Sequence, residues 1–312
     1  MKLLYEEQMN CWNDVFFNFT KKIMKVLVTG SAGKLGSAVM QRLRSAGLTA
    51  IGADLIESPY TDVILDIKDK AGVLNVCRQI NAVIHTAAIH GKHYDLDYPR
   101  EAFVDTNICG TLNLLNASVQ HRIQHFLYIS TTSVYGTAMV DPLQAVWVDE
   151  SLTEQPRDIY DITKQAAEQL CKDFFYKEGL HTSVYRVGRF LPEDPNVEAN
   201  HRLYRGLDER DGAEALYLGL SHHFERFEIF NISSSSPFTK DDLIGLKKNP
   251  SEAIIKLYPQ AAEIYKINGW SFPESIDRLY VTDKARELLG YSPKYTFDYL
   301  LKKSASSDIL RV

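Results

Sequence analysis

The sequence predicts an α/β fold: a doubly wound parallel sheet, followed by a smaller lobe towards the C-terminus. Short apolar runs typical of buried strands alternate with segments of helical periodicity over most of the 312 residues. This alternation indicates a parallel sheet that helices cover on both faces. After Arg186 the pattern loosens, and prolines divide the chain into short elements, which predicts the less regular lobe.

The first predicted elements are a strand, a glycine-rich turn and a helix. The apolar run 26–28 is the strand, and the turn follows at 29–36. Leu35, Val39 and Leu43 recur at helical spacing and predict the helix. Further strands are expected at 49–53, 63–65, 82–86, 125–130, 182–187 and 226–232, with long helices at 99–120 and 158–178.

These elements divide the chain into two expected domains and an extension. Residues 24–187, with 211–232 returning to them, are expected to form a nucleotide-binding domain, and 188–210 with 233–312 the small lobe. Residues 1–23 are an extension of uncertain role, rich in aromatic side chains. They predict either an additional packed helix or a start codon placed upstream of the true one.

Composition excludes several classes of function. The hydrophobic fraction of 45% and charged fraction of 24% are ordinary for a globular protein, and the net charge of -5 argues against nucleic acid or an anionic membrane as a partner. No apolar stretch reaches the length of a membrane span. The four cysteines are far apart without a C-x-x-C pair, which indicates buried thiols in a reducing compartment and predicts a cytoplasmic protein.

The glycine-rich turn predicts a dinucleotide site. Gly30, Gly33 and Gly36 follow a strand and open a helix, an arrangement that brings backbone N–H groups and a helix N-terminus to a pyrophosphate. Asp54 lies 18 residues after Gly36 at the end of the second strand, where a carboxylate accepts the ribose hydroxyls and repels a 2′-phosphate. NAD is therefore favoured over NADP. The alternatives are a structural glycine turn and a loop aspartate.

A series of motifs resembles a known family, the extended short-chain dehydrogenases/reductases of the NAD-dependent epimerase/dehydratase kind. The matching pieces are T-G-x-x-G-x-x-G at 29–36, D at 54, L-D-I at 65–67, H-T-A-A at 85–88, N-x-x-G-T at 107–111, S-T-T-S-V-Y-G at 130–136, Y-x-x-x-K at 160–164, R-V-G-R at 186–189, D-G-A-E-A at 211–215, F-N-I-S at 230–233 and L-G-Y-S-P at 289–293. The resemblance runs from about Lys25 to Tyr299 and implies a Rossmann-type fold, NAD as cofactor and a possible homodimer. The implied cofactor-binding residues are Gly30, Ala32, Gly33, Lys34, Leu35, Gly36, Asp54, Asp66, Ile67, Thr86, Ala87, Ala88, Asn107 and Lys164.

The predicted catalytic residues are Tyr160, Lys164 and Thr131. Three Y-x-x-x-K matches occur, at 160, 280 and 299, but only the first follows a Ser/Thr cluster at the end of a central strand. Tyrosine and lysine at i and i+4 share one helix face, so we expect the Lys164 ammonium to lower the pKa of the Tyr160 phenol. Tyr160 would then remove a hydroxyl proton while hydride leaves the same carbon. The resemblance implies Thr131 as the hydroxyl donor to the substrate.

No metal site is expected. His85, His90 and His93 have no spacing of a tetrahedral set and no cysteine nearby. They are interpreted as loop histidines at the cofactor or substrate mouth, and His90 is a predicted substrate-binding residue.

Departures from the family's motifs reduce the number of reactions that the protein could catalyse. Dehydratases of the family carry an Asp-Glu pair where Thr132 and Ser133 stand, so elimination of water lacks its acid and base. Epimerase and dehydrogenase remain, and the compact stretch after Arg186 is similar to uronate dehydrogenases. Thr132, Arg189 and Arg202 are the predicted substrate-binding residues. Together with Arg205, the two arginines suit an anionic sugar derivative.

Two alternatives stay open at this point. The arginines could pair with Glu193, Asp194 and Asp208 in a solvated loop. The protein could also be a catalytically silent NAD(P)-binding sensor or structural protein of the same fold.

Overall fold

The computed structural model describes residues 24–90, 97–190 and 193–308, which form two compact units. Unit 1 comprises the described residues up to Tyr128 together with Ala167–Ser183 and Leu216–Glu228. Unit 2 comprises Ile129–Ala166, Val184–Ala215 and the described residues from Ile229 onward. The expected extension 1–23 lies outside the described residues.

The units divide the chain differently from the expected domains. Residues 129–166 were assigned to the nucleotide-binding domain but belong to unit 2, with the lobe. The physical reason is a set of buried contacts around Tyr135. Its hydroxyl donates to Asn231 at 2.8 Å, and the Asn231 amide donates to the carbonyl of Val148 at 3.2 Å. These bonds attach the segment after the fifth strand to the C-terminal half of the chain.

A seven-stranded sheet with the order β3-β2-β1-β4-β5-β7-β8 is the centre of the fold. Its strands are β1 (Lys25–Thr29), β2 (Thr49–Asp54), β3 (Val63–Ile64), β4 (Ala82–His85), β5 (His125–Thr131), β7 (His181–Val187) and β8 (Glu228–Ile232). β1 pairs with β2 and β4, β2 with β3, and β4 with β5, all in parallel. The predicted Rossmann-type parallel sheet is confirmed, with the expected strands displaced by at most two residues.

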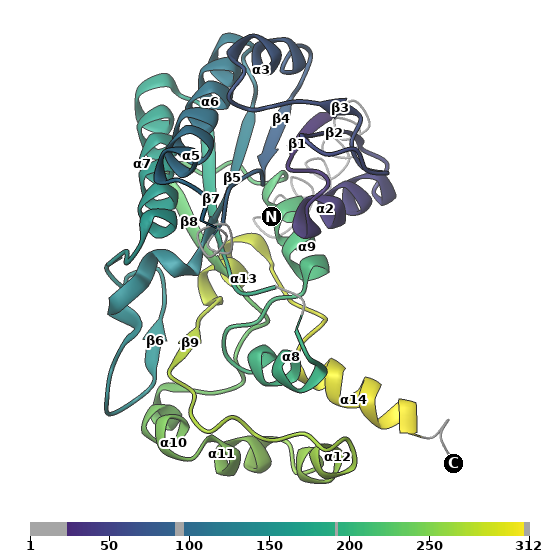
Figure 1. Cartoon of the computed structure of the whole chain (residues 1–312), viewed down its shortest axis with the longest axis vertical. Helices are drawn as coiled ribbons and strands as arrows, with labels where there is room; N and C mark the ends of the chain where they lie inside the picture. Colours follow the sequence, from purple (N-terminus) through teal and green to yellow (C-terminus); the bar gives the residue numbers. More distant parts are fainter. Residues whose placement is uncertain (1–23, 91–96, 191–192, 309–312) are drawn as a thin grey trace, which may run out of the picture. The chain divides into compact units, whose positions relative to one another are not determined.

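Helices cover both faces of the first strands in unit 1. They are α2 (Lys34–Ser45), α3 (Lys70–Val76), α5 (Arg100–Phe103) and α6 (Thr111–Gln120). Figure 1 shows α2 on one side of β1, β2 and β4, and α3 with α6 on the other. The apolar positions that predicted α2 are its buried face: Leu35, Val39 and Leu43 are at most 3% exposed.

The long helix expected at 99–120 is interrupted. A π-helical segment, η1 (Val104–Gly110), separates α5 from α6. One extra residue in a turn redirects the side chains that follow, and such segments are frequent at functional sites. Here it carries Asn107, which faces inward and is 1% exposed.

Two longer helices have residues in both units. They are α7 (Ile159–Glu178), which was expected at 158–178, and α9 (Glu209–Gly219).

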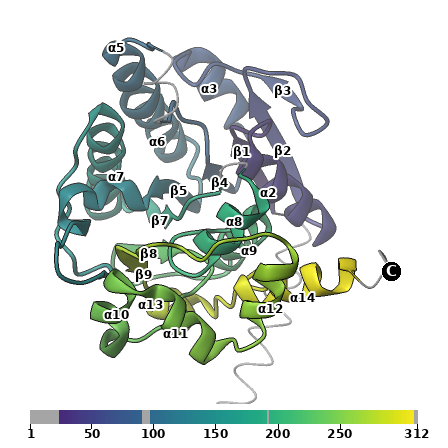
Figure 2. The same ribbon diagram turned by 60° about the horizontal axis from the view of Figure 1, so that its bottom comes forward.

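Unit 2 contains a small second sheet and several short helices. β6 (Val146–Val148) pairs in parallel with β9 (Arg278–Tyr280). The helices are α8 (Pro195–Arg202), α10 (Leu243–Lys248), α11 (Pro250–Leu257), α12 (Ala261–Ile267), α13 (Asp283–Leu289) and α14 (Phe297–Asp308), with the 3-10 segments η2 (Thr132–Met139) and η3 (Lys240–Asp242). Figure 2 shows α10, α11 and α12 following one another beside β9. Prolines begin α8 and α11, and Gly290 ends α13 in a left-handed conformation, so these helices stay short.

The lobe has its own hydrophobic core, which includes Leu203, Phe238, Leu246, Leu279 and Phe297. No helix of the described residues is long and apolar enough to cross a membrane. Of the cysteines within the described ranges, two are buried as expected and Cys109 is exposed.

Candidate active site

The glycine turn after β1 has no room for side chains. Gly30 has a φ of +75°, and a Cβ there would lie 2.6 Å from both the amide nitrogen of Ala87 and the hydroxyl of Thr86. A Cβ on Gly36 would lie 2.0 Å from the carbonyl oxygen of Gly30. Since no real Cβ approaches this closely, both positions require glycine, and the backbone remains open to a ligand.

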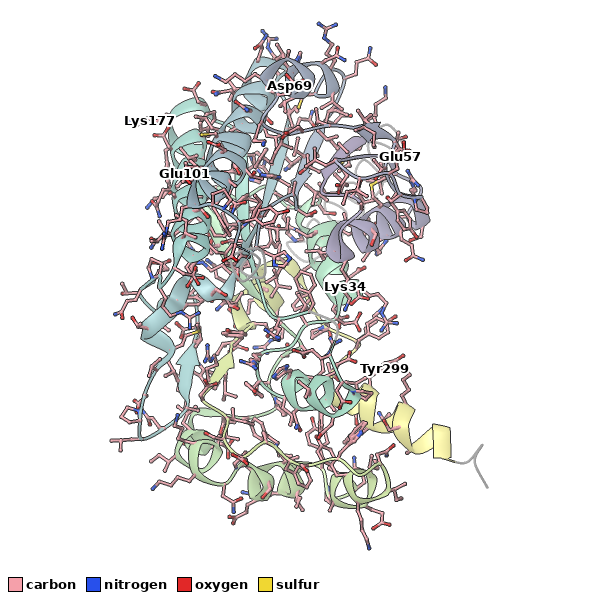
Figure 3. The ribbon with its side chains drawn as sticks, viewed as in Figure 1. Lys34, Glu57, Asp69, Glu101, Lys177 and Tyr299 are labelled. Carbon is pink, nitrogen blue, oxygen red and sulfur yellow. The ribbon has the colours of Figure 1, made fainter. Side chains whose placement is uncertain are left out.

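The N-terminus of α2 has the features of a phosphate site. Gly33 is its N-cap residue, no side chain caps the helix, and no acidic residue lies in the first turn. Lys34 begins the helix (labelled in Figure 3) and Leu35 packs beneath it, 3% exposed. The positive end of the helix dipole is therefore available to a pyrophosphate.

Asp54 ends β2 beside this turn. Its carboxylate accepts the amide N–H of Ala32 at 2.9 Å and that of Ile56 at 3.1 Å. These bonds hold the carboxylate at the carboxyl end of the sheet and leave lone pairs for two hydroxyl groups. Asp54 is thus where the sequence predicted a ribose contact.

Asp66 and Ile67 follow β3 and are supported from α6. Asp66 accepts the amide of Lys68 at 2.9 Å. The side chain of Asn113 donates to the carbonyl of Ile67 at 3.0 Å, and Gly110 leaves room for the Ile67 side chain. Sequence reasoning missed Asn113, one of the buried polar residues of α6.

The loop after β4 is held by hydroxyl and amide groups. The Thr86 hydroxyl donates to the carbonyl of Thr29 at 2.7 Å, which brings Ala87 against Gly30. Asn107 bonds both sides of the Ile89 peptide: its amide donates to the carbonyl at 2.8 Å and its oxygen accepts the N–H at 2.9 Å. Asn107 therefore positions the Ala87–Ala88 loop.

The three predicted loop histidines have different positions. His85 is buried, with Nδ1 2.7 Å from the Thr29 hydroxyl and Nε2 3.0 Å from that of Thr111. It joins β1, β4 and α6 and is structural. His90 is half-buried at the end of the loop, and His93 lies outside the described residues. Within those residues, no three His, Cys, Asp or Glu side chains are grouped to hold a metal.

The predicted catalytic residues, Thr131, Tyr160 and Lys164, belong to unit 2 and come from β5 and α7. β5 ends at Thr131, whose hydroxyl lies near enough to the phenol of Tyr160 to lower its pKa. The Thr131 oxygen also accepts the amide N–H of Ser133 at 3.1 Å. A hydroxyl and a neighbouring phenol at the carboxyl end of a parallel strand can act on one substrate oxygen.

Lys164 lies one helical turn beyond Tyr160 and is 3% exposed. Its ammonium donates to the carbonyl of Ile129 in β5. Burial of an ammonium group costs free energy unless the group is hydrogen-bonded. This bond therefore fixes where this part of α7 lies along β5.

The pKa of Tyr160 differs from expectation. Burial raises it to about 12, which outweighs the lowering effect of the Thr131 hydroxyl, while the carboxylates of Asp161 and Asp158 raise it further. The expectation that Lys164 leaves Tyr160 with a lowered pKa is wrong for the ligand-free protein. Desolvation of the phenolate is the stronger effect.

A buried network, also missed in the sequence, positions the segment after β5. Gly136 has a φ of +52°, and a Cβ there would lie 1.7 Å from the carbonyl oxygen of Gln155. The ring of Tyr135 packs 4.8 Å from the guanidinium of Arg186, which pairs with Glu154. The motif S-V-Y-G thus acts through packing and turn geometry.

Three of the predicted substrate residues lie after strands or in α8. Thr132 follows β5, Arg189 follows β7, and Arg202 ends α8. Thr132 is buried, and its hydroxyl reaches the carbonyl of Val187 at 3.4 Å. Arg189 pairs with Glu193. Arg202 is 4% exposed and its guanidinium contacts Glu198 at 2.8 Å and Asp208 at 3.1 Å.

Arg205 has different contacts. One of its terminal nitrogens lies 2.6 Å from Nε2 of His201, whose Nδ1 bonds to Glu193 at 2.5 Å. Within the described chain, its Nε is buried without a hydrogen-bond partner. The carboxylate of Asp277, which pairs with Arg278, is near enough for the Arg205 charge to help lower its pKa.

Comparison with known proteins agrees with this geometry. A protein-family model described as the NAD dependent epimerase/dehydratase family matches residues 26–205, and the chain belongs to that family. NAD is accordingly its cofactor, and Gly30, Gly36, the bare α2 N-terminus and Asp54 fit it.

The relatives carry different names. The bifunctional protein gal10 of Schizosaccharomyces pombe is 34% identical over 176 residues, 51% of this chain and 23% of that protein. A uronate dehydrogenase of Pseudomonas putida is 24% identical over 184 residues, 57% and 65% of the two chains. The chain thus matches less than two thirds of each of these curated relatives.

Among solved structures, a short-chain dehydrogenase/reductase superfamily protein from Agrobacterium tumefaciens with bound NAD has a TM-score of 0.69 at 21% identity, covering 92% of this chain and 98% of that one. At this identity the likeness shows the fold.

Proposed function

We propose that this protein is an NAD-dependent oxidoreductase that oxidises a hydroxyl-bearing carbon of a sugar, sugar acid or nucleotide sugar. The observation that carries the proposal is the hydroxyl–phenol pair of Thr131 and Tyr160, above the buried ammonium of Lys164. A catalytically silent NAD(P)-binding protein needs no such pair.

The proposed chemistry divides between residues and cofactor. The Thr131 hydroxyl bonds to the substrate oxygen and orients it, and Tyr160 takes the hydroxyl proton. Bound NAD accepts the hydride that leaves the same carbon. Lys164 supplies positive charge one turn away, which opposes the effect of burial on the phenolate.

We further propose an anionic substrate. Arg189 and Arg202 have carboxylate partners within the protein, whereas the buried Nε of Arg205 has no hydrogen-bond partner among the described residues. A substrate carboxylate or phosphate would satisfy its buried Nε. Of the three arginines that the sequence suggested for an anion, Arg205 is therefore the best candidate to bind it.

Two outcomes of the oxidation remain to be distinguished. A dehydrogenase releases the oxidised product and NADH, whereas an epimerase returns the hydride to the other face. The uronate dehydrogenase relative favours the first and the epimerase/dehydratase family model the second. The short segment between Arg186 and Asp211 favours the first, because it leaves little chain to clamp a nucleotide.

The test is turnover with a panel of uronates, neutral sugars and nucleotide sugars, followed by NADH absorbance and product analysis. Net NADH identifies a dehydrogenase, and isomer formation without net NADH an epimerase. Binding of NAD without turnover on the whole panel would support the sensor alternative. Arg205→Gln should raise KM about ten-fold or more for the anionic substrate and leave a neutral one unchanged.

A homodimer and a cytoplasmic location, both expected from the sequence, belong to this proposal and are tested by light scattering and by cell fractionation.

A further inference from the structure

His201 lies between a carboxylate and an arginine in unit 2. It belongs to the last turn of α8 and is 8% exposed. Its Nδ1 lies 2.5 Å from Oε2 of Glu193, and its Nε2 lies 2.6 Å from a terminal nitrogen of Arg205. Within the described residues no ion pair joins Glu193 to Arg205. The imidazole therefore separates an anion from a cation.

The two bonds fix the tautomer of His201. A guanidinium has N–H donors and no acceptor, so Nε2 accepts from Arg205. Nδ1 then carries the proton and donates it to the Glu193 carboxylate. Burial, followed by the charge of Arg205, lowers the pKa of His201 below its usual 6.5, which outweighs the raising effect of Glu193. His201 is therefore a neutral bridge at pH 7.

Stability alone does not account for a neutral group in this place. Glu193 pairs directly with Arg189, and a direct contact with Arg205 would give a second charge-assisted bond. The nearby carboxylate of Asp277 is held by Arg278, whose Nε lies 3.0 Å from Oδ1. The Nε of Arg205 is buried without a hydrogen-bond partner among the described residues, which costs folding free energy. The arrangement thus keeps a donor of Arg205 open at the expense of stability.

Arg205 is attached to the end of the sheet that carries the predicted catalytic hydroxyl. Its carbonyl accepts the amide N–H of Arg189 at 2.9 Å. Arg189 lies two residues after Val187, which ends β7 and whose carbonyl is 3.4 Å from the hydroxyl of Thr132. Thr132 directly follows Thr131, and all of these residues belong to unit 2. Arg205 therefore lies within one unit with the strand ends at which the substrate is expected.

We propose that His201 is a positioning residue that holds Arg205 apart from Glu193 and so keeps its guanidinium available to the anionic group of the substrate. This rests on the proposed function, in which Arg205 binds that group. The substrate carboxylate or phosphate then takes the place beside Arg205 that Glu193 would otherwise occupy. His201 acts only through Arg205 and transfers no proton to the substrate.

The test measures KM and kcat for D-glucuronate and D-galacturonate, with D-glucose and D-galactose as their neutral counterparts. His201→Leu removes both bonds and lets Glu193 approach Arg205, so KM for the uronates should rise about five- to ten-fold while kcat changes less than about two-fold. His201→Gln keeps an acceptor and a donor on one planar group and should restore most of the affinity. Asn200→Ala, the matched control, removes a bond from the same helix to the carbonyl of Ser271 and should leave KM as in the parent.

A double variant separates this role from a general loss of structure. In His201→Leu combined with Glu193→Gln, the carboxylate that competes for Arg205 is gone, so KM for the uronates should fall back towards the parent value. Structural damage would instead accumulate. A double variant with a higher KM than His201→Leu would overturn the proposal.

A second readout needs no substrate. With ¹⁵N-labelled histidine, the His201 signals, assigned by their loss in His201→Gln, should show a protonated Nδ1 and an accepting Nε2. The opposite tautomer would overturn the bridge between Glu193 and Arg205.

The outcomes also distinguish this proposal from the function on which it rests. Equal KM values in the parent and His201→Leu, with a raised KM in Arg205→Gln, would overturn the role of His201 and leave the proposed function standing. A parent protein that treats uronates and neutral sugars alike would overturn the anionic substrate and this inference with it. Turnover by Tyr160→Phe would overturn the proposed chemistry itself.

Discussion

At the scale of single residues, context distinguishes Tyr160 from tyrosines with the same local spacing. Tyr299 and Lys303 repeat Y-x-x-x-K on α14, yet Tyr299 packs near Arg210 in the lobe (Figure 3) and has no strand-end hydroxyl among its described contacts. Tyr160 meets Thr131 at the end of β5.

We therefore predict that Tyr160→Phe lowers kcat by about 10²- to 10⁴-fold, the range for loss of a general base, while the Kd for NAD stays within a few-fold. Steady-state kinetics and calorimetric NAD titration measure the two quantities. Tyr299→Phe is the matched control, and its kcat should equal that of the parent. A large loss of NAD affinity in Tyr160→Phe would point to a binding role instead.

Asp54 serves both the turn and the predicted ribose contact. Asp54→Ala should weaken NAD by about 10- to 100-fold, because charge-assisted hydrogen bonds of about 1.5–3 kcal/mol are lost. It should weaken NADP less, because a carboxylate repels a 2′-phosphate. Asp54→Asn keeps an acceptor for the Ala32 amide and removes only the charge. The ratio of the two dissociation constants measures the effect, and an unchanged ratio in both variants would refute the ribose contact.

At the scale of elements, long periodic segments were predictable and short or long-range ones were not. β5 was expected at 125–130, because a central buried strand is a continuous apolar run. In the structure it ends one residue later, at Thr131. β6 and β9 were missed since each has three residues and their partners are more than 100 positions apart. The π-helical η1 was missed because helical periodicity continues across it.

The candidate site follows the same rule. Gly30, Asp54 and Tyr160 belong to motifs of neighbouring residues, so they could be predicted as site residues from the sequence alone. The partners of Arg202 and Arg205 depend on how α8 folds against the segment after β7. Only the structure shows that Arg202 pairs with Asp208, whereas the Nε of Arg205 has no hydrogen-bond partner among the described residues.

The neighbouring β5 and β7 also bring together a histidine pair that spacing could not reveal. His125 and His181 begin these strands, with their Nδ1 atoms 3.1 Å apart, and His223 stacks on His181 at 4.1 Å. The amide of Phe224 donates to Nε2 of His181 at 2.6 Å. His181 is therefore neutral with its proton on Nδ1, which it donates to His125.

Burial is the main reason that the pKa of each histidine falls from 6.5 to about 4, and the other imidazoles of the cluster lower it further. Since the folded pKa lies below the unfolded one, unfolding takes up protons. Stability is complete above about pH 6.5 and is lost as the pH falls towards 4.

We predict a loss of about 2 kcal/mol for each of the two histidines between pH 7 and pH 5, measured by urea unfolding. His125→Phe should reduce this pH dependence, and His222→Gln, a control in the same loop, should not. Equal pH dependence in parent and His125→Phe would contradict the assignment.

At the scale of the whole molecule, the two units share the strands of one sheet. β5, β7 and β8 each contribute residues to unit 1 and to unit 2. The predicted NAD residues from Gly30 to Asn107 belong to unit 1, whereas Tyr160 and Lys164 belong to unit 2. Because a strand cannot lose half of its residues without disrupting its ladder, we expect both units to unfold together.

NAD should consequently stabilise the entire chain. A ligand at 100 times its Kd adds about 2.7 kcal/mol to the free energy of unfolding. With an unfolding entropy of about 2.1 cal/mol/K per residue over 312 residues, Tm should rise by about 4 °C. Calorimetry should show a single transition that moves as one, and Asp54→Ala should abolish most of the shift at the same NAD concentration. Two transitions, of which NAD moves only one, would show that the strand continuity between the units does not couple their stability.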